Sequence, residues 1–133
     1  MIIQNLMKTF ILLLTFISFT LCVTEKETLY DLNNSSVMNL NAKNFHNQIT
    51  SNRSKNIVSI IHFYKPGDGK SRGLKISFEK FATEYNGMYK VTALNCQLFM
   101  DICEKNEVKE FPSFKVYPPI PAPIMDYEVS LLL

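Results

Sequence analysis

Several features that would point to a ligand class are scarce in this sequence. The 133 residues carry 14 basic and 12 acidic side chains, and the net charge of +2 is too small to favour nucleic acid or an anionic membrane. Cysteine occurs three times, too sparsely for a zinc site. There is no low-complexity run, and the length leaves room for one small domain. We therefore expect no metal, no cofactor and no nucleic-acid partner.

The N-terminus carries the longest apolar run. Lys8 precedes a mostly apolar stretch from Phe10 to Val23. The apolar core of this stretch is as long as that of a secretory signal peptide and shorter than the roughly 20 residues of a membrane span. Residues 1–23 are therefore predicted to be a signal peptide, after whose cleavage no membrane contact remains. An uncleaved anchor is the alternative, since residues 1–3 add apolar side chains. Residues 24–36, rich in Asn and Ser, are predicted to be a disordered lead-in.

The remaining pattern predicts strands that alternate with helices. The strands contain isoleucine, valine and aromatic residues, and the longest helix repeats its apolar side chains at helical spacing. Asn41 is expected to cap the first helix, residues 51–54 to form a turn, and Gly87 to adopt a left-handed conformation after the second helix. The predicted strands are 37–40, 56–64, 89–94 and 113–117, and the helices 41–49, 71–85 and 98–105. This βαβαβαβ order implies an α/β layer architecture.

Three stretches, in order, carry a family resemblance. They are the strand and loop from Ile57 to Arg72, the helix with Leu74 and Phe78, and the triplet Phe111-Pro112-Ser113. Together with Val37-Met38-Asn39-Leu40 and the helix after it, they resemble the thioredoxin-type domain of the protein disulfide isomerase family over residues 36–117. The resemblance implies a thioredoxin-like fold with a mixed central sheet and a cis peptide bond before Pro112.

The loop after the central strand departs from that family. Asp68 and Ser71 stand where the resemblance places the two cysteines of the Cys-x-x-Cys site, and Gly67 replaces an aromatic residue. A disulfide oxidoreductase needs a thiolate at a helix N-terminus and a second, resolving thiol. We therefore expect no catalytic residue in this degenerate active-site loop, which comprises Gly67, Asp68, Gly69, Lys70 and Ser71. Asp68 is expected to serve as an anion at the helix start.

Two further positions differ from the family pattern. His62 replaces a buried glutamate that relays protons in the family, and it is expected to be a hydrogen-bonded core residue. Ile76 replaces a proline that kinks the family's second helix, so a straighter helix is expected here.

The triplet Gly69-Lys70-Ser71 is similar to the end of a phosphate-binding loop. That motif needs a glycine where Tyr64 stands, and the loop is too short to surround phosphates. No nucleotide partner is expected.

Once a signal peptide is removed, the remaining cysteines are Cys96 and Cys103. The resemblance places a non-catalytic pair at this position, and a structural disulfide is expected in an oxidising compartment. A free buried pair is the alternative.

The resemblance suggests a function without redox chemistry. In the family, backbone beside the cis proline lies against the active-site loop and pairs with extended peptides. Phe111, Pro112 and Ser113 are therefore predicted to line a peptide-binding groove together with Tyr64–Gly69. The chain is then a redox-inactive, chaperone-like domain that binds unfolded or partner polypeptides in the endoplasmic reticulum lumen or after secretion. The alternatives are a weakly active thiol–disulfide oxidoreductase that uses Cys96 and Cys103, or a truncated fragment without independent function.

The C-terminal segment departs most from the family. The prolines of residues 118–123 precede a possible strand at 124–128, and the closing helix of the family is missing. We expect a domain at 37–129, a tail at 130–133 and one sheet face left partly uncovered, with an apolar patch. The absence of a Lys-Asp-Glu-Leu tail leaves retention and secretion both open.

Overall fold

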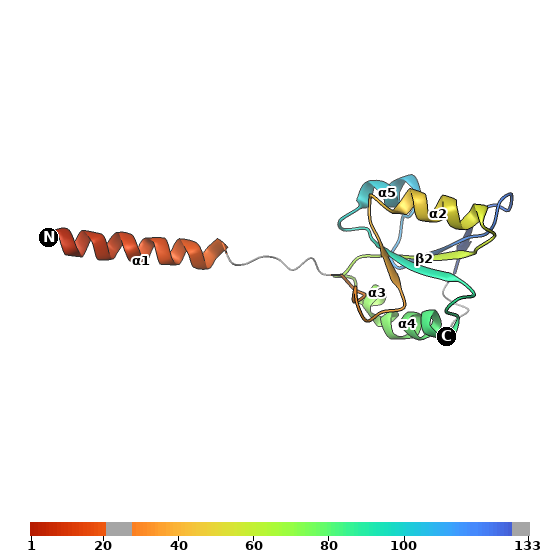
Figure 1. Ribbon diagram of the computed structural model, residues 1–133, viewed down its shortest axis with the longest axis horizontal. Coiled ribbons are helices and arrows are strands. Elements are labelled where there is room, and N and C mark those ends of the chain that lie inside the picture. The colour runs from red at the N-terminus through yellow and green to blue at the C-terminus, as the bar shows by residue number, and fades with distance from the viewer. Residues whose placement is uncertain (21–27, 129–133) are drawn as a thin grey trace.

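The computed structural model describes the backbone of residues 1–20 and 28–128 and the side chains of residues 1–12 and 28–128. The predicted tail at 130–133 and the predicted cleavage point after residue 23 lie outside these ranges. Helix α1 (Ile2–Thr20) forms the N-terminal arm in Figure 1, and its side chains over residues 1–12 are exposed. Within the described ranges, no helix combines the length and hydropathy that a bilayer span requires.

Five strands form one mixed sheet in the order β1-β3-β2-β4-β5. The strands β1, β2 and β3 are mutually parallel, while β4 runs antiparallel to β2 and β5 antiparallel to β4. The thioredoxin-like α/β fold with a mixed sheet, predicted from the sequence, is confirmed. The strands are β1 (Met38–Leu40), β2 (Ser59–Tyr64), β3 (Lys90–Asn95), β4 (Ser113–Tyr117) and β5 (Met125–Tyr127).

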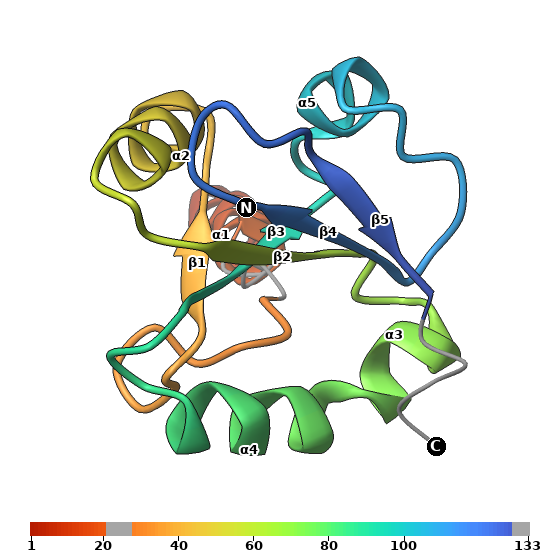
Figure 2. The same ribbon diagram turned by 90° about the vertical axis from the view of Figure 1, so that its right-hand side faces the viewer.

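Helices pack on both faces of the sheet, as Figure 2 shows. Helices α2 (Phe45–Ser54) and α5 (Met100–Lys105) lie on one face, and α3 (Gly69–Gly73) and α4 (Lys75–Glu84) on the other. Alternate residues of β2 divide between two cores because successive strand side chains point to opposite faces. Ile61 and Phe63 belong to the α2/α5 core, and Tyr64 belongs to the α4 core.

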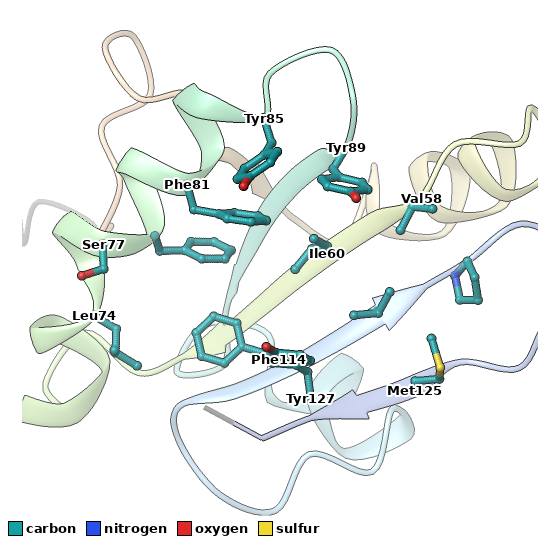
Figure 3. A pocket seen from close by; sticks show the side chains of 13 residues that line it. Val58, Ile60, Leu74, Ser77, Phe81, Tyr85, Tyr89, Phe114, Met125 and Tyr127 are labelled. Carbon is teal, nitrogen blue, oxygen red and sulfur yellow. The ribbon is translucent and has the colours of Figure 1, made fainter. Parts of the chain in front are cut away.

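The face that carries α4 is only partly covered. An apolar groove of about 590 Å³ lies between α4 and the strands β2, β4 and β5 (Figure 3). Phe81 and Tyr85 line it from the helix, and Ile60 and Met125 line it from the sheet. The sequence predicted an uncovered apolar patch on one sheet face, and this groove is such a patch.

The lead-in expected to be disordered is partly core, and that expectation is wrong for Leu29 and Tyr30. Tyr30 is fully buried and Leu29 is 9% exposed, and both pack in the α4 core. The backbone N–H of Leu29 donates to the hydroxyl of Tyr64 at 3.2 Å. The domain therefore begins before residue 37.

The helix predicted at 41–49 lies at Phe45–Ser54, so the cap expected at Asn41 and the turn expected at 51–54 are both wrong. Arg53 donates to the backbone oxygens of Pro118 at 2.8 Å and Ala122 at 2.6 Å, and buried Asn52 donates to Ser59 Oγ at 2.9 Å. These contacts fix the last turn of α2 against the sheet. Asn41 forms a turn ahead of the helix, since its side chain accepts from the N–H groups of Lys43 and Asn44.

The second predicted helix is two helices, so the expectation of a straight helix is wrong. Leu74, with φ −90° and ψ −7°, ends α3 and begins α4. Gly73 immediately before it weakens helical continuity because glycine loses the most backbone freedom in a helix. Ile76, which replaces the family's proline and was the reason to expect a straight helix, lies inside α4 and is 79% exposed. Gly87 has φ +88°, the left-handed conformation predicted for it.

Candidate functional site

The candidate site begins where β2 ends. Asp68 caps α3, and its Oδ2 accepts a hydrogen bond from the backbone N–H of Ser71 at 2.7 Å. That hydrogen bond lowers the pKa of the Asp68 carboxyl, and the nearby charges of Lys70 and Arg72 act in the same direction. A carboxylate at this helix start satisfies a backbone donor that the helix leaves free. Asp68 thus holds α3 in place.

Ser71 is the buried residue of α3. It is 0% exposed, and its Oγ has no hydrogen-bond partner among the described residues. A fully enclosed hydroxyl is not an accessible nucleophile, and the adjacent Asp68 carboxylate, whose pKa is lowered, is a weak base. Neither side chain at the helix start therefore offers nucleophilic chemistry.

His62 lies in the middle of β2 and is fully buried. Its Nδ1 is 2.6 Å from the hydroxyl of Tyr30, and its ring stacks on Phe114 with centroids 4.5 Å apart and planes 8° apart. Burial lowers the pKa of His62 to about 3. The imidazole is therefore neutral and enclosed by aromatic rings, which suits a core residue and not a proton shuttle working near neutral pH.

The loop before β4 reaches the same end of the sheet. The Phe111–Pro112 peptide bond is cis, and Ser113 Oγ donates to the backbone oxygen of Glu110 at 2.6 Å. The Lys65 ammonium lies 4.7 Å from the centre of the Phe111 ring, a cation–π contact. The segments Tyr64–Gly69 and Phe111–Ser113, which were predicted to border a groove, are therefore in contact.

A cleft of about 780 Å³ lies between these segments, here called the proline cleft. Its lining mixes apolar side chains with charged ones from α3, the Glu107–Ser113 loop and β5. The residues are Lys70, Gly73, Leu74, Glu107, Lys109, Glu110, Phe111, Pro112, Ser113, Phe114, Asp126, Tyr127 and Glu128. Of the two segments predicted to form a groove, Phe111–Ser113 lines this cleft and Tyr64–Gly69 does not, whereas Lys70 of the degenerate active-site loop does. The other loop residues, Gly67, Asp68, Gly69 and Ser71, do not line it, and the Asp68 carboxylate accepts from the backbone N–H of Ser71 within the α3 turn.

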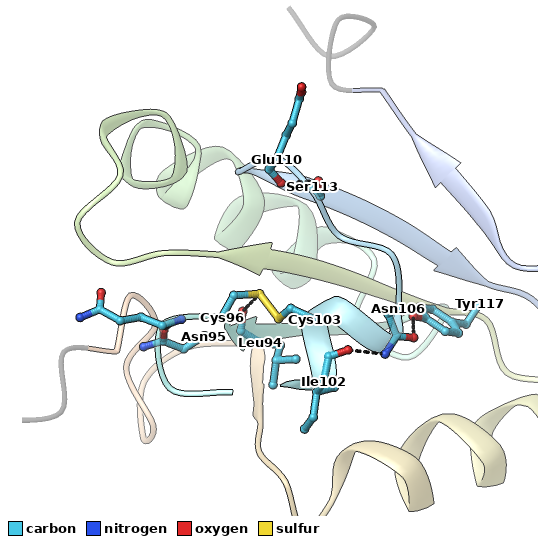
Figure 4. Close-up of a disulfide and its surroundings, with 10 residues drawn as sticks. Leu94, Asn95, Cys96, Ile102, Cys103, Asn106, Glu110, Ser113 and Tyr117 are labelled. Atoms are coloured by element: carbon cyan, nitrogen blue, oxygen red, sulfur yellow. Dashed lines mark hydrogen bonds between the residues drawn. A yellow bond between two sulfur atoms is a disulfide. The ribbon is translucent and has the colours of Figure 1, made fainter. Parts of the chain in front are cut away.

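The cysteines lie elsewhere. Cys96, which follows β3, and Cys103 in α5 form a disulfide with Cα atoms 5.9 Å apart (Figure 4). Both are 0% exposed and belong to the α2/α5 core, on the sheet face opposite α3 and α4. The pair ties α5 to the end of β3 and has no surface toward a substrate.

The described part of the chain contains no cluster of side chains suited to binding a metal ion. Over residues 1–20 and 28–128, no three His, Cys, Asp or Glu side chains gather closely enough to hold an ion.

Comparison with known proteins then decides the family. The model of the thioredoxin family, described as "Thioredoxin", matches residues 36–127. The chain belongs to the thioredoxin family. Its thioredoxin domain is 30% identical over 102 residues to a Dictyostelium discoideum protein named as a putative protein disulfide-isomerase, covering 77% of this chain and 24% of that protein. It is 29% identical over 103 residues to protein disulfide-isomerase MPD1 of Saccharomyces cerevisiae, covering 76% and 31%.

A solved structure agrees with this placement of the thioredoxin domain. The crystal structure of ERdj5 form I superposes with a TM-score of 0.66 at 26% identity, over 74% of this chain and 13% of that one. The chain spans 24% and 31% of the lengths of the two curated relatives. The thioredoxin domain is thus similar to one part of larger protein disulfide-isomerase-like proteins.

Sequence reasoning missed two parts of the thioredoxin domain near the site. It did not find Tyr30, the partner of His62, because a lone aromatic in a polar segment gives no periodic signal. It also did not assign Glu128, Asp126 or Tyr127 to the cleft, since only the pairing of β5 with β4 brings them there.

Proposed function

We propose that this chain is a polypeptide-binding thioredoxin domain of the protein disulfide-isomerase type that does not carry out thiol–disulfide exchange. The observation that carries the proposal is the proline cleft, whose described lining contains no thiol. Exchange requires an accessible low-pKa thiolate and a resolving thiol. The α3 start offers the Asp68 carboxylate and the enclosed Ser71 hydroxyl in their place.

The cleft has the groups needed to hold an extended chain. Phe111 and Leu74 line the cleft and offer apolar contact. Pairing of the peptide with the backbone beside the cis Pro112 is the proposed mode of binding. Such binding needs no covalent capture, so its affinity comes from main-chain hydrogen bonds and side-chain burial. Unfolded or partner polypeptides are therefore the proposed ligands.

The proposed place of action is the endoplasmic reticulum lumen or the secreted space. The support is the apolar N-terminal segment, predicted to be a signal peptide, and the names of the similar proteins, two of which are disulfide-isomerases. The buried disulfide suits an oxidising compartment.

Two assays test the proposal. In insulin reduction with dithiothreitol, the wild-type chain is expected to add nothing to the background rate, whereas the double variant Asp68→Cys with Ser71→Cys gains turnover. In crosslinking with a photoreactive unfolded peptide, labels are expected at Phe111–Ser113. Wild-type turnover, or the absence of labels near these residues, would contradict the proposal.

A weakly active oxidoreductase is the second candidate, favoured by the oxidised state of Cys96 and Cys103. It predicts insulin turnover that alkylation of the reduced pair abolishes. The full burial of both sulfurs argues against it.

A further inference from the structure

Three short motifs in the sequence play no part in the proposed function. They are Asn-x-Ser triplets, the pattern at which an oligosaccharide is linked to asparagine in chains that enter the secretory pathway. Two of the triplets overlap and begin at Asn33 and Asn34, and the third begins at Asn52. Because such triplets occur often by chance, the fold has to decide which of them a folded chain can carry in modified form.

The third triplet, Asn52-Arg53-Ser54, is built into the domain. Asn52 lies in α2 and is 6% exposed, and its Nδ2 donates to Ser59 Oγ at 2.9 Å. An oligosaccharide linked to Nδ2 needs room that a close-packed interior does not have, and it would separate Asn52 from Ser59. A chain modified at Asn52 before folding therefore cannot place α2 against the sheet as it lies here.

The two overlapping triplets lie on the surface instead. Asn33 and Asn34 are both exposed, in a turn over residues 32–34. Asp31 Oδ1 accepts hydrogen bonds from the backbone N–H groups of both asparagines, at 2.7 Å from Asn33 and 3.0 Å from Asn34. Leu32 in the same turn is 74% exposed. The turn therefore projects into solvent with a backbone that is held by hydrogen bonds, and it has room for an oligosaccharide.

Both ends of the turn are fixed to the domain. Tyr30 before it and Val37 after it are buried, and Ser36 Oγ lies 3.0 Å from Thr83 Oγ1 in the last turn of α4. Figure 2 shows this segment, in orange, beside the C-terminal end of α4, whereas α3 lies at the other end of that helix. Leu74, where α4 begins, lines the proline cleft, and the helix between Leu74 and Thr83 is about 14 Å long. An oligosaccharide on the turn is therefore attached well away from the proline cleft.

We propose that the folded chain carries an N-linked oligosaccharide on Asn33 or Asn34 and none on Asn52. The donor is an oligosaccharide on a lipid diphosphate, and a membrane glycosyltransferase of the secretory pathway catalyses the transfer. Nδ2 of the asparagine forms a bond to C1 of the first sugar, and the bond from C1 to the diphosphate oxygen breaks. The amide proton and the lipid diphosphate leave, without oxidation or reduction. This inference rests on the proposed place of action, because the chain meets such a donor only inside that compartment.

Expression of the full chain in a eukaryotic cell line tests the proposal. The chain is recovered from the medium and from the protease-protected content of microsomes, and the folded monomer is isolated by size-exclusion chromatography. The wild-type monomer is expected to migrate more slowly in gel electrophoresis, and digestion with peptide-N-glycosidase is expected to abolish this shift. The digestion converts the linked asparagine into aspartate, and mass spectrometry of peptides is expected to locate the conversion at Asn33 or Asn34. Conversion at Asn52 in the folded monomer would overturn the proposal.

Two variants separate the turn from the third triplet. Asn33→Gln combined with Asn34→Gln removes both exposed asparagines, and the mobility shift is expected to be lost completely. Ser54→Ala, at an exposed position, removes the third triplet without altering buried Asn52, and it is the matched control that is expected to keep the full shift. Thermal melts establish that both variants are folded. A shift that persists in the double variant, or one that Ser54→Ala removes, would contradict the proposal.

Failure of this inference is distinguishable from failure of the proposed function. A wild-type monomer that is secreted or protease-protected but carries no oligosaccharide would overturn the inference and leave the proposed place of action intact. A chain that is neither secreted nor protected would overturn both. Peptide crosslinking at Phe111–Ser113 is expected to be the same before and after digestion with the glycosidase, because the turn and the proline cleft lie at opposite ends of α4.

Discussion

The hydroxyl of Tyr30 lies 2.6 Å from Nδ1 of His62, and both side chains are completely buried. Burial raises the pKa of Tyr30 well above its ordinary value, so the phenol stays protonated. This bond joins the segment before β1 to the centre of the sheet. It also gives the neutral imidazole a partner inside an aromatic cluster formed with Phe78 and Phe114.

Removing that hydroxyl is expected to destabilise the domain. Tyr30→Phe leaves Nδ1 of His62 buried without its partner, and the cost of an unpaired buried polar atom is about 1–3 kcal/mol. Urea unfolding followed by circular dichroism measures the change. Tyr127→Phe, at a 40% exposed position, is the control and is expected to change the free energy of unfolding by less than about 0.5 kcal/mol. Equal stability of Tyr30→Phe and wild type would show that the bond contributes nothing.

His62 is expected to make stability depend on pH below neutrality. Its pKa is about 3 in the folded chain, against about 6.5 when unfolded. The unfolded state therefore binds a proton first as pH falls below 6.5. The contribution of neutral His62 to the free energy of unfolding is complete above pH 6.5. It declines by up to about 1.4 kcal/mol per pH unit below that pH and is lost fully near pH 3.

The effect of His62 on the free energy of unfolding is best measured between pH 7 and pH 5. The lowered pKa values of Asp31 and Asp68 place their titration in more acidic solution. At pH 5 the loss from His62 is about 2 kcal/mol. His62→Phe should flatten the dependence of the free energy of unfolding on pH, while His46→Gln at an exposed position should retain it. A wild-type free energy that stays constant between these pH values would refute the assignment.

The disulfide is expected to act on stability alone. Replacing Cys96 and Cys103 together by alanine should lower the free energy of unfolding by about 2 kcal/mol, because the pair closes a short loop of sequence separation 7. Both sulfurs are buried, so reduction of the native chain by dithiothreitol should be far slower than reduction in urea. The extent of reduction is measured by alkylating the free thiols and recording the increase in mass of the protein. Equally fast reduction in both conditions would mean that the pair is accessible in the folded domain.

Asp68 is expected to matter as a helix cap. Asp68→Ala removes the acceptor for the Ser71 N–H, so the melting temperature should fall. Asp68→Asn keeps a side-chain oxygen at this position and should melt near wild type. Differential scanning fluorimetry compares the three proteins, and equal melting of the alanine variant would show that the cap does not hold α3.

Much of the α/β order could be read from local pattern. The apolar run before Tyr64 predicted the buried central strand, and the spacing of Phe78, Phe81 and Tyr85 predicted a helix packed against the sheet. The unexpected end of α2 at Ser54 has a tertiary cause. Arg53 holds the last turn of α2 through carbonyl groups 65 and 69 positions away, and a local pattern carries no information about such partners. The break at Leu74 has a local signal instead, since Gly73 comes immediately before it.

The sequence by itself determined the order of strands and helices and the absence of cysteines from the loop at Asp68–Ser71, because periodicity and residue identity are local properties. Only the tertiary structure decided that Tyr30 belongs to the core and that β5 places Tyr127 beside Leu74 and Phe114. The same holds for the groove beside α4, since it is formed by residues from three strands and a helix that are brought together by sheet pairing and burial.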